Sequence, residues 1–162
     1  MYFEELKRAM HWLSEQEGTV FLGQAVSYPG TSMTTTLEDV QREKLVELPA
    51  TEEMQMGMTI GLALDGYVPV SIYPRWNFLL LAMNQLVNHL DKMQEISNGG
   101  YQTRVIVRTS IGSERPLHPQ YQHVGDFTDG FRLICRNLDI VRLEEPGDIF
   151  PAYQHALNRD DG

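Results

Sequence analysis

Residues 51–73 read TEEMQMGMTIGLALDGYVPVSIY, and this stretch decides the class of the fold. Its first part predicts a helix, because Thr51 can cap the helix start and is followed by Glu52 and Glu53, which the helix dipole favours in the first turn. Gly66 suits the position just beyond the end of that helix. The following residues 67–73 are rich in β-branched and aromatic side chains and predict a buried strand.

The same alternation continues in both directions along the chain. Apolar spacing predicts helices at residues 3–16, at 76–96 and at 147–158, and apolar runs predict strands at 19–26, 104–109 and 138–143. Polar stretches with Pro and Gly predict loops at 27–36 and 110–128. We therefore expect an α/β fold of three layers, a mostly parallel sheet with helices on both faces. Ligands bind at the carboxyl ends of such strands, so the loops after residues 26, 73 and 109 should line any site.

Composition narrows the class of protein. The chain has 162 residues with 42% hydrophobic and 22% charged, which is typical of one globular domain. A net charge of −9 with 13 Lys and Arg argues against a nucleic-acid partner. The lone Cys135 excludes a disulfide within the chain and fits a reducing compartment, and the apolar run at residues 78–90 is too short and too polar to span a bilayer. We expect a cytoplasmic protein with no membrane partner.

Three ordered segments carry a resemblance to a known family. The first is P-x-T-E-x4-G-x3-G from Pro49 to Gly61; the second is YPRWNF at 73–78, which runs into AMNQLVN at 82–88; the third is SNGG at 97–100, followed by a strand and by Gln122-His123. Together these segments resemble the pyrimidine-binding domain of the beta subunits of 2-oxoacid dehydrogenases, a branch of the transketolase-like superfamily that uses thiamine diphosphate. The resemblance implies a thiamine-diphosphate-binding fold and a single pyrimidine-binding domain over residues 1–162.

The resemblance assigns a catalytic role to Glu52. In the family, the matching glutamate bonds the N1′ atom of the cofactor's aminopyrimidine ring and exchanges a proton with it, which calls for a pKa raised by burial. The methionines at 54, 56 and 58 are the expected apolar neighbours. From the residues alone, Glu52 is more simply a first-turn carboxylate that satisfies the helix dipole.

Three further residues receive roles from the same resemblance. Phe78 matches the aromatic that stacks on the pyrimidine ring, and Trp76 is a second candidate for the pocket wall. His123, in the pair Gln122-His123, matches an active-site histidine, with His118 as the alternative. From the residues alone, Phe78 is more simply a core side chain, and His118 and His123 are more simply solvated histidines of a loop.

Two spaced glycines and two substitutions concern pairing of subunits. Gly57 and Gly61 lie one turn apart on a predicted helix, and the resemblance implies self-pairing of subunits there; close packing inside the domain is the alternative. Gln24 and Asn84 stand where relatives carry acids, which puts in doubt any coupling between paired active sites.

The other half of the cofactor site is not found in this sequence. The diphosphate and its Mg²⁺ need a Gly-Asp-Gly…Asn segment, which the chain lacks, so we assign it no metal ligands and expect a partner chain to supply both. A diphosphate-binding domain and the usual carboxy-terminal domain are also missing, whether the chain is naturally short or a fragment.

The leading hypothesis is one half of a split enzyme that decarboxylates a 2-oxo acid. The alternatives are a ketol transferase acting on a sugar phosphate, with Arg75, Arg108 and Arg115 as candidate phosphate ligands, and a non-catalytic assembly subunit.

Overall fold

A four-stranded parallel sheet forms the centre of the molecule. The computed structural model describes residues 1–115 and 118–159. The strands are β1 (Thr19–Gly23), β2 (Leu45–Glu47), β3 (Val68–Tyr73) and β4 (Ile106–Thr109), in the order β2-β1-β3-β4. Every pair is parallel, with Phe21 opposite Leu45 and Val70, and Val70 opposite Ile106. The expected α/β class with a parallel sheet is confirmed.

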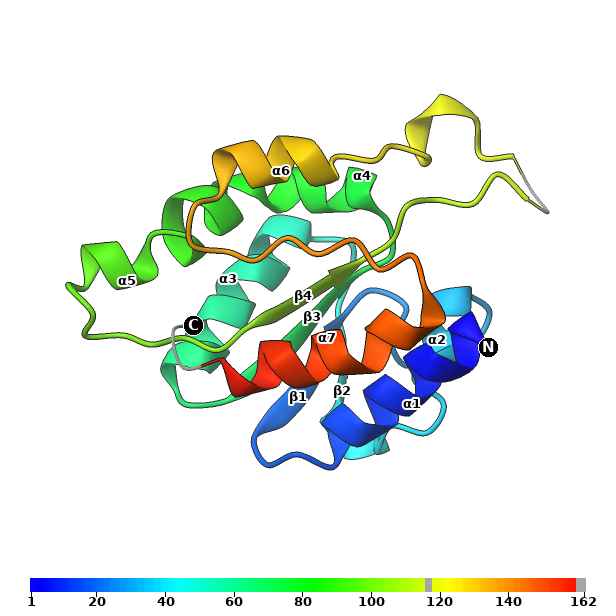
Figure 1. The fold of residues 1–162 in the computed structure, drawn as a ribbon, viewed down its shortest axis with the longest axis horizontal. Helices are drawn as coiled ribbons and strands as arrows, with labels where there is room; N and C mark the ends of the chain where they lie inside the picture. The colour runs from blue at the N-terminus through cyan, green and yellow to red at the C-terminus, as the bar shows by residue number, and fades with distance from the viewer. Residues whose placement is uncertain (116–117, 160–162) are drawn as a thin grey trace.

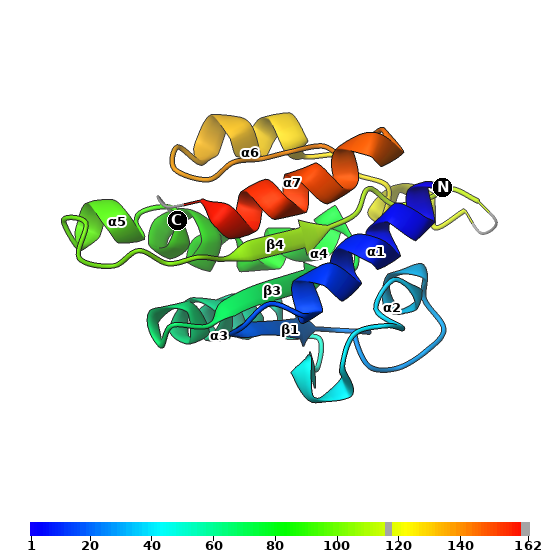
Figure 2. The same cartoon turned by 60° about the horizontal axis from the view of Figure 1, so that its bottom comes forward.

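Helices cover both faces of this sheet. Helices α1 (Tyr2–Ser14) and α7 (Pro146–Asn158) lie side by side across one face, as Figures 1 and 2 show. Helix α3 (Glu52–Leu64) packs on the other face, together with α4 (Trp76–Leu79) and α6 (Thr128–Ile134). Each face buries its own apolar cluster, one with Met10, Phe21 and Ile149 and the other with Met56, Leu79 and Phe131. The expected three layers are therefore present.

The backbones of β1 and β3 leave no room for a side chain where β1 ends. Gly23 ends β1 at φ +152°, and a Cβ there would overlap the carbonyl oxygen of Ile72. The buried Gln55 of α3 completes this junction, since its Nε2 donates to Ile72 O and to Ser71 Oγ, each at 3.0 Å. Only glycine permits this backbone approach, so the sequence position of Gly23 determines where β1 stops.

Several elements differ from those expected. The long helix at residues 76–96 is interrupted: α4 is followed by a 3₁₀ turn η2 (Leu80–Ala82), a π-helical segment η3 (Gln85–Leu90) and α5 (Met93–Ile96). The loop at 27–36 contains the short α2 (Ser32–Thr35), while η1 (Arg42–Lys44), β2, η4 (Gln120–Gln122) and α6 were not predicted. Three residues are too few for a periodic signal, which is why β2 escaped sequence reasoning.

The strand predicted at residues 138–143 is wrong. This stretch is extended, with Leu138, Ile140 and Leu143 half-buried, but it pairs with no strand in the described part of the chain. The alternating pattern arises because one side of an extended segment packs on the core, which requires no ladder of hydrogen bonds. Arg132 Nε donates to the Ile140 carbonyl at 3.0 Å instead.

A buried carboxylate ties the helical layer together. Asp91 follows η3 directly, and its Oδ1 accepts the backbone N–H groups of Arg136 at 2.9 Å and Asn137 at 2.8 Å. Its Oδ2 accepts a hydrogen bond from Lys92 Nζ at 2.7 Å. Burial disfavours ionisation, but the bonds from Lys92 and Asn137 outweigh it and lower the pKa of Asp91 from its ordinary value.

No helix in residues 1–115 and 118–159 has the length and apolarity needed to cross a bilayer.

The Asp91 carboxylate should make folding sensitive to acid. Because its folded pKa lies below the ordinary 3.8, its contribution is complete above about pH 4 and is lost as pH falls through the folded value. We expect Asp91→Asn to lower the free energy of unfolding by about 2 kcal/mol at pH 7, since the amide presents N–H groups to the Lys92 ammonium. Urea titrations at pH 7 and pH 3 measure this. The exposed Asp65→Asn is the control, and an equal effect of both variants would contradict the assignment.

Candidate active site

The carboxyl ends of all four strands lie at one edge of the sheet, and the predicted site residues follow them. Glu52 comes after β2, Phe78 after β3 and His123 after β4. Parallel strands place the segments that follow them at the same edge. This edge is the candidate active site.

Glu52 begins α3 and is half-buried. Its carbonyl oxygen accepts a hydrogen bond from the hydroxyl of Tyr73, the last residue of β3, at 3.2 Å. Burial raises the pKa of the Tyr73 hydroxyl, which therefore stays protonated and remains a donor. Thr51 occupies the N-cap position of α3 as expected, but its hydroxyl donates to Pro49 O at 3.3 Å and bonds no N–H group of the helix. The start of α3 is thus fixed by β3, and its first N–H groups receive no bond from the Thr51 side chain.

The surroundings of Glu52 are more open than expected. Glu52 lines an open hollow together with Thr51, Glu53, Met54 and Leu81. Of the three methionines, only Met56 reaches the core, whereas Met54 and Met58 are exposed. Met54 lines the same hollow as Glu52, whereas Met56 turns to the core, because a helix turns residues two positions apart to different sides.

Phe78 and His123 are brought together by the fold. Their rings meet edge to face with centroids 5.3 Å apart, although the residues lie on separate segments. Both are half-buried, and the imidazole Nδ1 is buried without a hydrogen-bond partner. No hydrogen bond or ring contact joins either one to Glu52 in the described residues, but Leu81, one helical turn beyond Phe78, lines the hollow with Glu52. The three residues therefore share the carboxyl edge of the sheet, where each follows the end of a strand.

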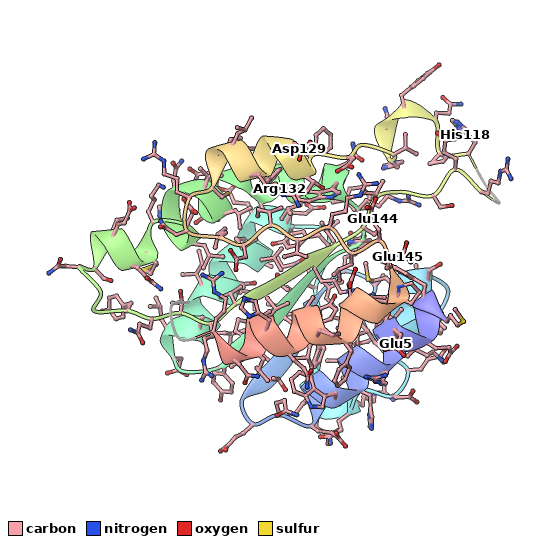
Figure 3. The ribbon with its side chains drawn as sticks, viewed as in Figure 1. Glu5, His118, Asp129, Arg132, Glu144 and Glu145 are labelled. Atoms are coloured by element: carbon pink, nitrogen blue, oxygen red, sulfur yellow. The ribbon has the colours of Figure 1, made fainter. Side chains whose placement is uncertain are left out.

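The other two candidates lie apart from this group. Trp76 is buried in the core, where its ring contacts that of Phe131 at 4.8 Å between centroids. His118 is exposed at the outer end of the loop, as Figure 3 shows, and its Nδ1 accepts the backbone N–H of Gln120 at 2.9 Å. Of the two histidines, His123 is the one that contacts another site candidate.

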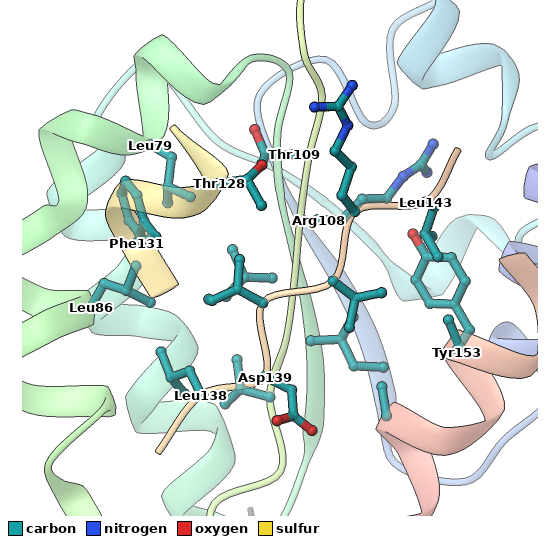
Figure 4. Close-up of a pocket in the computed structure, with 18 of the residues that line it drawn as sticks. Leu79, Leu86, Arg108, Thr109, Thr128, Phe131, Leu138, Asp139, Leu143 and Tyr153 are labelled. Atoms are coloured by element: carbon teal, nitrogen blue, oxygen red, sulfur yellow. The ribbon is translucent and has the colours of Figure 1, made fainter. Parts of the chain in front are cut away.

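A cavity of about 470 Å³ opens elsewhere, between β4 and the extended segment at residues 138–143. Figure 4 shows Leu79, Leu86 and Phe131 on one side of it and Leu143 and Tyr153 on the other. Its lining includes Trp76 but not Glu52, Phe78 or His123. The cavity follows the unpaired edge of β4, so it marks the place where the predicted strand fails to join the sheet.

Neither Cys135 nor a cluster of ligands adds chemistry to the site. Burial raises the pKa of the Cys135 thiol to about 11, so it stays protonated at neutral pH and is a core residue. In residues 1–115 and 118–159, no group of three or more His, Cys, Asp or Glu side chains is arranged to hold a metal ion.

Glu47 is a residue that sequence reasoning missed. It ends β2, and its carboxylate accepts three successive backbone N–H groups, from Ala25 and Ser27 at 2.7 Å and from Val26 at 2.9 Å. Ala25 adopts φ +58°, a conformation that costs a non-glycine residue free energy. Glu47 thus holds the loop after β1 in a strained shape beside the site. The sequence holds one signal for this role, the position of Glu47 as an acidic residue at the end of the short apolar run Leu45–Val46.

Comparison with known proteins gives distant relatives of one kind. The chain is 29% identical over 126 residues to the pyruvate dehydrogenase E1 component subunit beta of Gracilaria tenuistipitata var. liui, covering 75% of this chain and 39% of the relative. It is 26% identical over 159 residues to the 3-methyl-2-oxobutanoate dehydrogenase subunit beta of Mycobacterium tuberculosis (strain ATCC 25618 / H37Rv), covering 95% and 44%. The 2-oxoisovalerate dehydrogenase subunit beta of Bacillus subtilis (strain 168) is 27% identical over 115 residues, covering 68% and 35%. The chain spans less than half the length of these curated relatives. No protein-family model matches it.

The role of Glu47 can be measured on the chain itself. Glu47→Gln replaces one accepting oxygen by an amide group that faces backbone N–H groups. We expect it to lower the free energy of unfolding by about 2–3 kcal/mol and to speed hydrogen exchange at residues 25–27. The nearby exposed Glu43→Gln is the matched control. Unchanged exchange at residues 25–27 in Glu47→Gln would show that the loop holds its shape without the carboxylate.

Proposed function

The chain is a homologue of the beta subunits of 2-oxoacid dehydrogenases, and from this premise we propose that it is the pyrimidine-binding half of a thiamine-diphosphate-dependent enzyme that acts on a 2-oxo acid. In this proposal residues 1–162 are a single pyrimidine-binding domain, active only with a partner chain in the cytoplasm. The observation that carries it is the position of Glu52 at the first turn of α3, on the strand edge that also holds the Phe78–His123 pair.

The residues at this edge fit an aminopyrimidine ring. The cofactor, when bound, supplies the stabilisation of negative charge that decarboxylation of a 2-oxo acid requires. In this proposal the Glu52 carboxyl holds a proton at a ring nitrogen, and the open hollow that Glu52 lines supports this role. Phe78, whose ring contacts that of His123, offers an aromatic surface for the ring in this proposal. The orphaned Nδ1 of His123 is a buried polar atom that a bound molecule can satisfy, and imidazole can carry a proton near neutral pH. Trp76 supports this wall from the core and does not face the same hollow.

The open side of Glu52 is where we place the partner. Met54 and Leu81 are exposed beside Glu52. A chain that covers these two side chains would bury the carboxyl and keep water from the place of proton exchange. We propose that this chain carries the Gly-Asp-Gly…Asn segment and holds the diphosphate and its Mg²⁺.

The two alternatives receive less support. Phosphate binding by Arg75, Arg108 and Arg115 needs these side chains close together. Arg108 is buried and donates to Thr36 Oγ1 at 2.8 Å, whereas Arg75 donates to His123 O and Arg115 is exposed. No contact joins the three in the described residues. A non-catalytic role is the outcome if Glu52 proves dispensable.

The outer face of α3 supports self-pairing of this chain. Gly57 and Gly61 are exposed, and a Cβ at either position would meet nothing within 4 Å. Met58 and Leu64 are exposed along the same helix. Close packing inside the domain, the alternative reason for these glycines, is therefore wrong. We propose that a second copy packs on this face, where the absence of side chains lets backbones approach.

The catalytic proposal is tested with Glu52→Gln in the complex with the partner chain. We expect decarboxylation of a 2-oxo acid to fall by about 10²–10⁴-fold, because an amide cannot exchange the proton, while the cofactor still binds. Turnover and cofactor titration by calorimetry are the measurements. Glu53→Gln, the exposed neighbour on the same turn, should keep its activity. Full activity of Glu52→Gln would instead favour the assembly subunit.

The pairing proposal predicts opposite effects of Gly57→Leu on folding and on association. Leucine favours a helix over glycine by roughly 0.5–1 kcal/mol, so the free energy of unfolding of the monomer should rise. The added side chain should also weaken self-association by at least tenfold, measured by sedimentation. Unaltered self-association would place the pairing surface elsewhere.

A further inference from the structure

We propose that Arg75 is a positioning residue for His123, holding the backbone at this residue so that the imidazole lies against Phe78. The inference deepens the proposed function and rests on it for the role of His123. Arg75 lies in the turn between β3 and α4, directly before Trp76. The proposed function gives it no part in the role of His123.

The His123 side chain does not fix its own position. Its one ring contact is with Phe78, and neither ring nitrogen makes a hydrogen bond in the described residues. The place of the imidazole therefore depends on the backbone that carries it. That backbone belongs to the loop after β4, in whose described residues the short η4 is the one helical or strand element before α6.

The turn after β3 is what fastens this loop. Arg75 Nη1 donates to the His123 carbonyl at 3.1 Å, and Asn77 Oδ1 accepts the N–H of Gly125 at 3.3 Å. At the start of the loop, Ser110 O accepts the N–H of Trp76 at 3.0 Å and Ser110 Oγ donates to Pro74 O at 2.6 Å. The loop is held at both ends by one short turn, and Arg75 supplies the bond at His123 itself.

Gly112 shows how closely these groups are packed. A Cβ at Gly112 would overlap both the His123 carbonyl oxygen and Arg75 Nη1. The first part of the loop, at Gly112, therefore passes directly against the hydrogen bond between Arg75 and the His123 carbonyl, which holds the later part of the loop. A side chain at position 112 would displace one of the two partners, which links the residue identity at 112 to the position of His123.

The charge on Arg75 is directed to this carbonyl. No ion pair joins Arg75 to a carboxylate within residues 1–115 and 118–159. A hydrogen bond from a charged donor is stronger than one between neutral groups. Lysine can reach with a single donor and should preserve part of the bond, whereas methionine has similar length and no donor.

The test reads the imidazole of His123 by proton–carbon NMR of the full chain, with the signals assigned through His123→Asn. The Phe78 ring should shift the His123 signals away from those of an exposed histidine, and Phe78→Leu should abolish the shift. We expect Arg75→Met to move the signals to the exposed position and Arg75→Lys to move them part of the way. The methyl signals of Met10 and Leu13, which are buried in the core, are the internal control for folding. His123 signals unchanged in Arg75→Met would overturn the inference.

A second variant and a kinetic readout separate this inference from the proposed function. If Arg75→Met fails to fold, Gly112→Ala should produce the same movement of the His123 signals from the other side of the bond, and no movement in a folded Gly112→Ala would equally overturn the inference. In the active complex, Arg75→Met should lower kcat by about 10–100-fold with KM nearly unchanged, because a displaced proton carrier slows the chemical step. If the wild-type complex has no activity on any 2-oxo acid and Arg75→Met still moves the His123 signals, the positioning role is upheld and the proposed function is contradicted.

Discussion

The parallel pairing of β1 with β3 is the constraint on which the rest of the molecule depends. These two strands form the middle of the sheet, and their backbones meet so closely at Gly23 and Ile72 that no side chain fits between them. Gln55 reaches from α3 to this junction and satisfies the carbonyl of Ile72. The helix that begins with Glu52 is thereby held against the sheet from its second turn onward. A shift of one residue between the strands would move Glu52 relative to the segment that follows β3.

The candidate site is built on the segments that leave this sheet, and polar groups give those segments their shape. The Glu47 carboxylate collects three backbone N–H groups of the loop after β1. The Tyr73 hydroxyl bonds the first residue of α3, and Arg75 bonds the carbonyl of His123. In each case a side chain from the end of a strand, or just beyond it, satisfies backbone groups of another segment. Loops without ladders of hydrogen bonds need such partners to adopt one conformation.

The candidate site presents apolar and polar groups to the outside. Glu52 lines a hollow rather than an enclosed pocket, and exposed methionine and leucine side chains adjoin it. The Nδ1 atom of His123 is buried without a partner. The proton exchange proposed for Glu52 calls for a carboxyl that is shielded from water. These features are explained together if a second chain and a cofactor cover this edge.

The sequence by itself determined the class of fold, the order of most elements and the identity of the candidate residues. Apolar periodicity and glycine placement depend on neighbouring residues only, so β3, α1, α3 and α7 could be predicted from local pattern. Only the tertiary structure decided which candidates meet. It brought His123 against Phe78, left His118 exposed and placed Trp76 in the core, because contacts between distant segments are set by the packing of the sheet edge. It also decided that residues 138–143 stay unpaired and that Glu47 and Arg75 bind backbone groups far along the chain, since a hydrogen bond between remote segments leaves no periodic trace in the sequence.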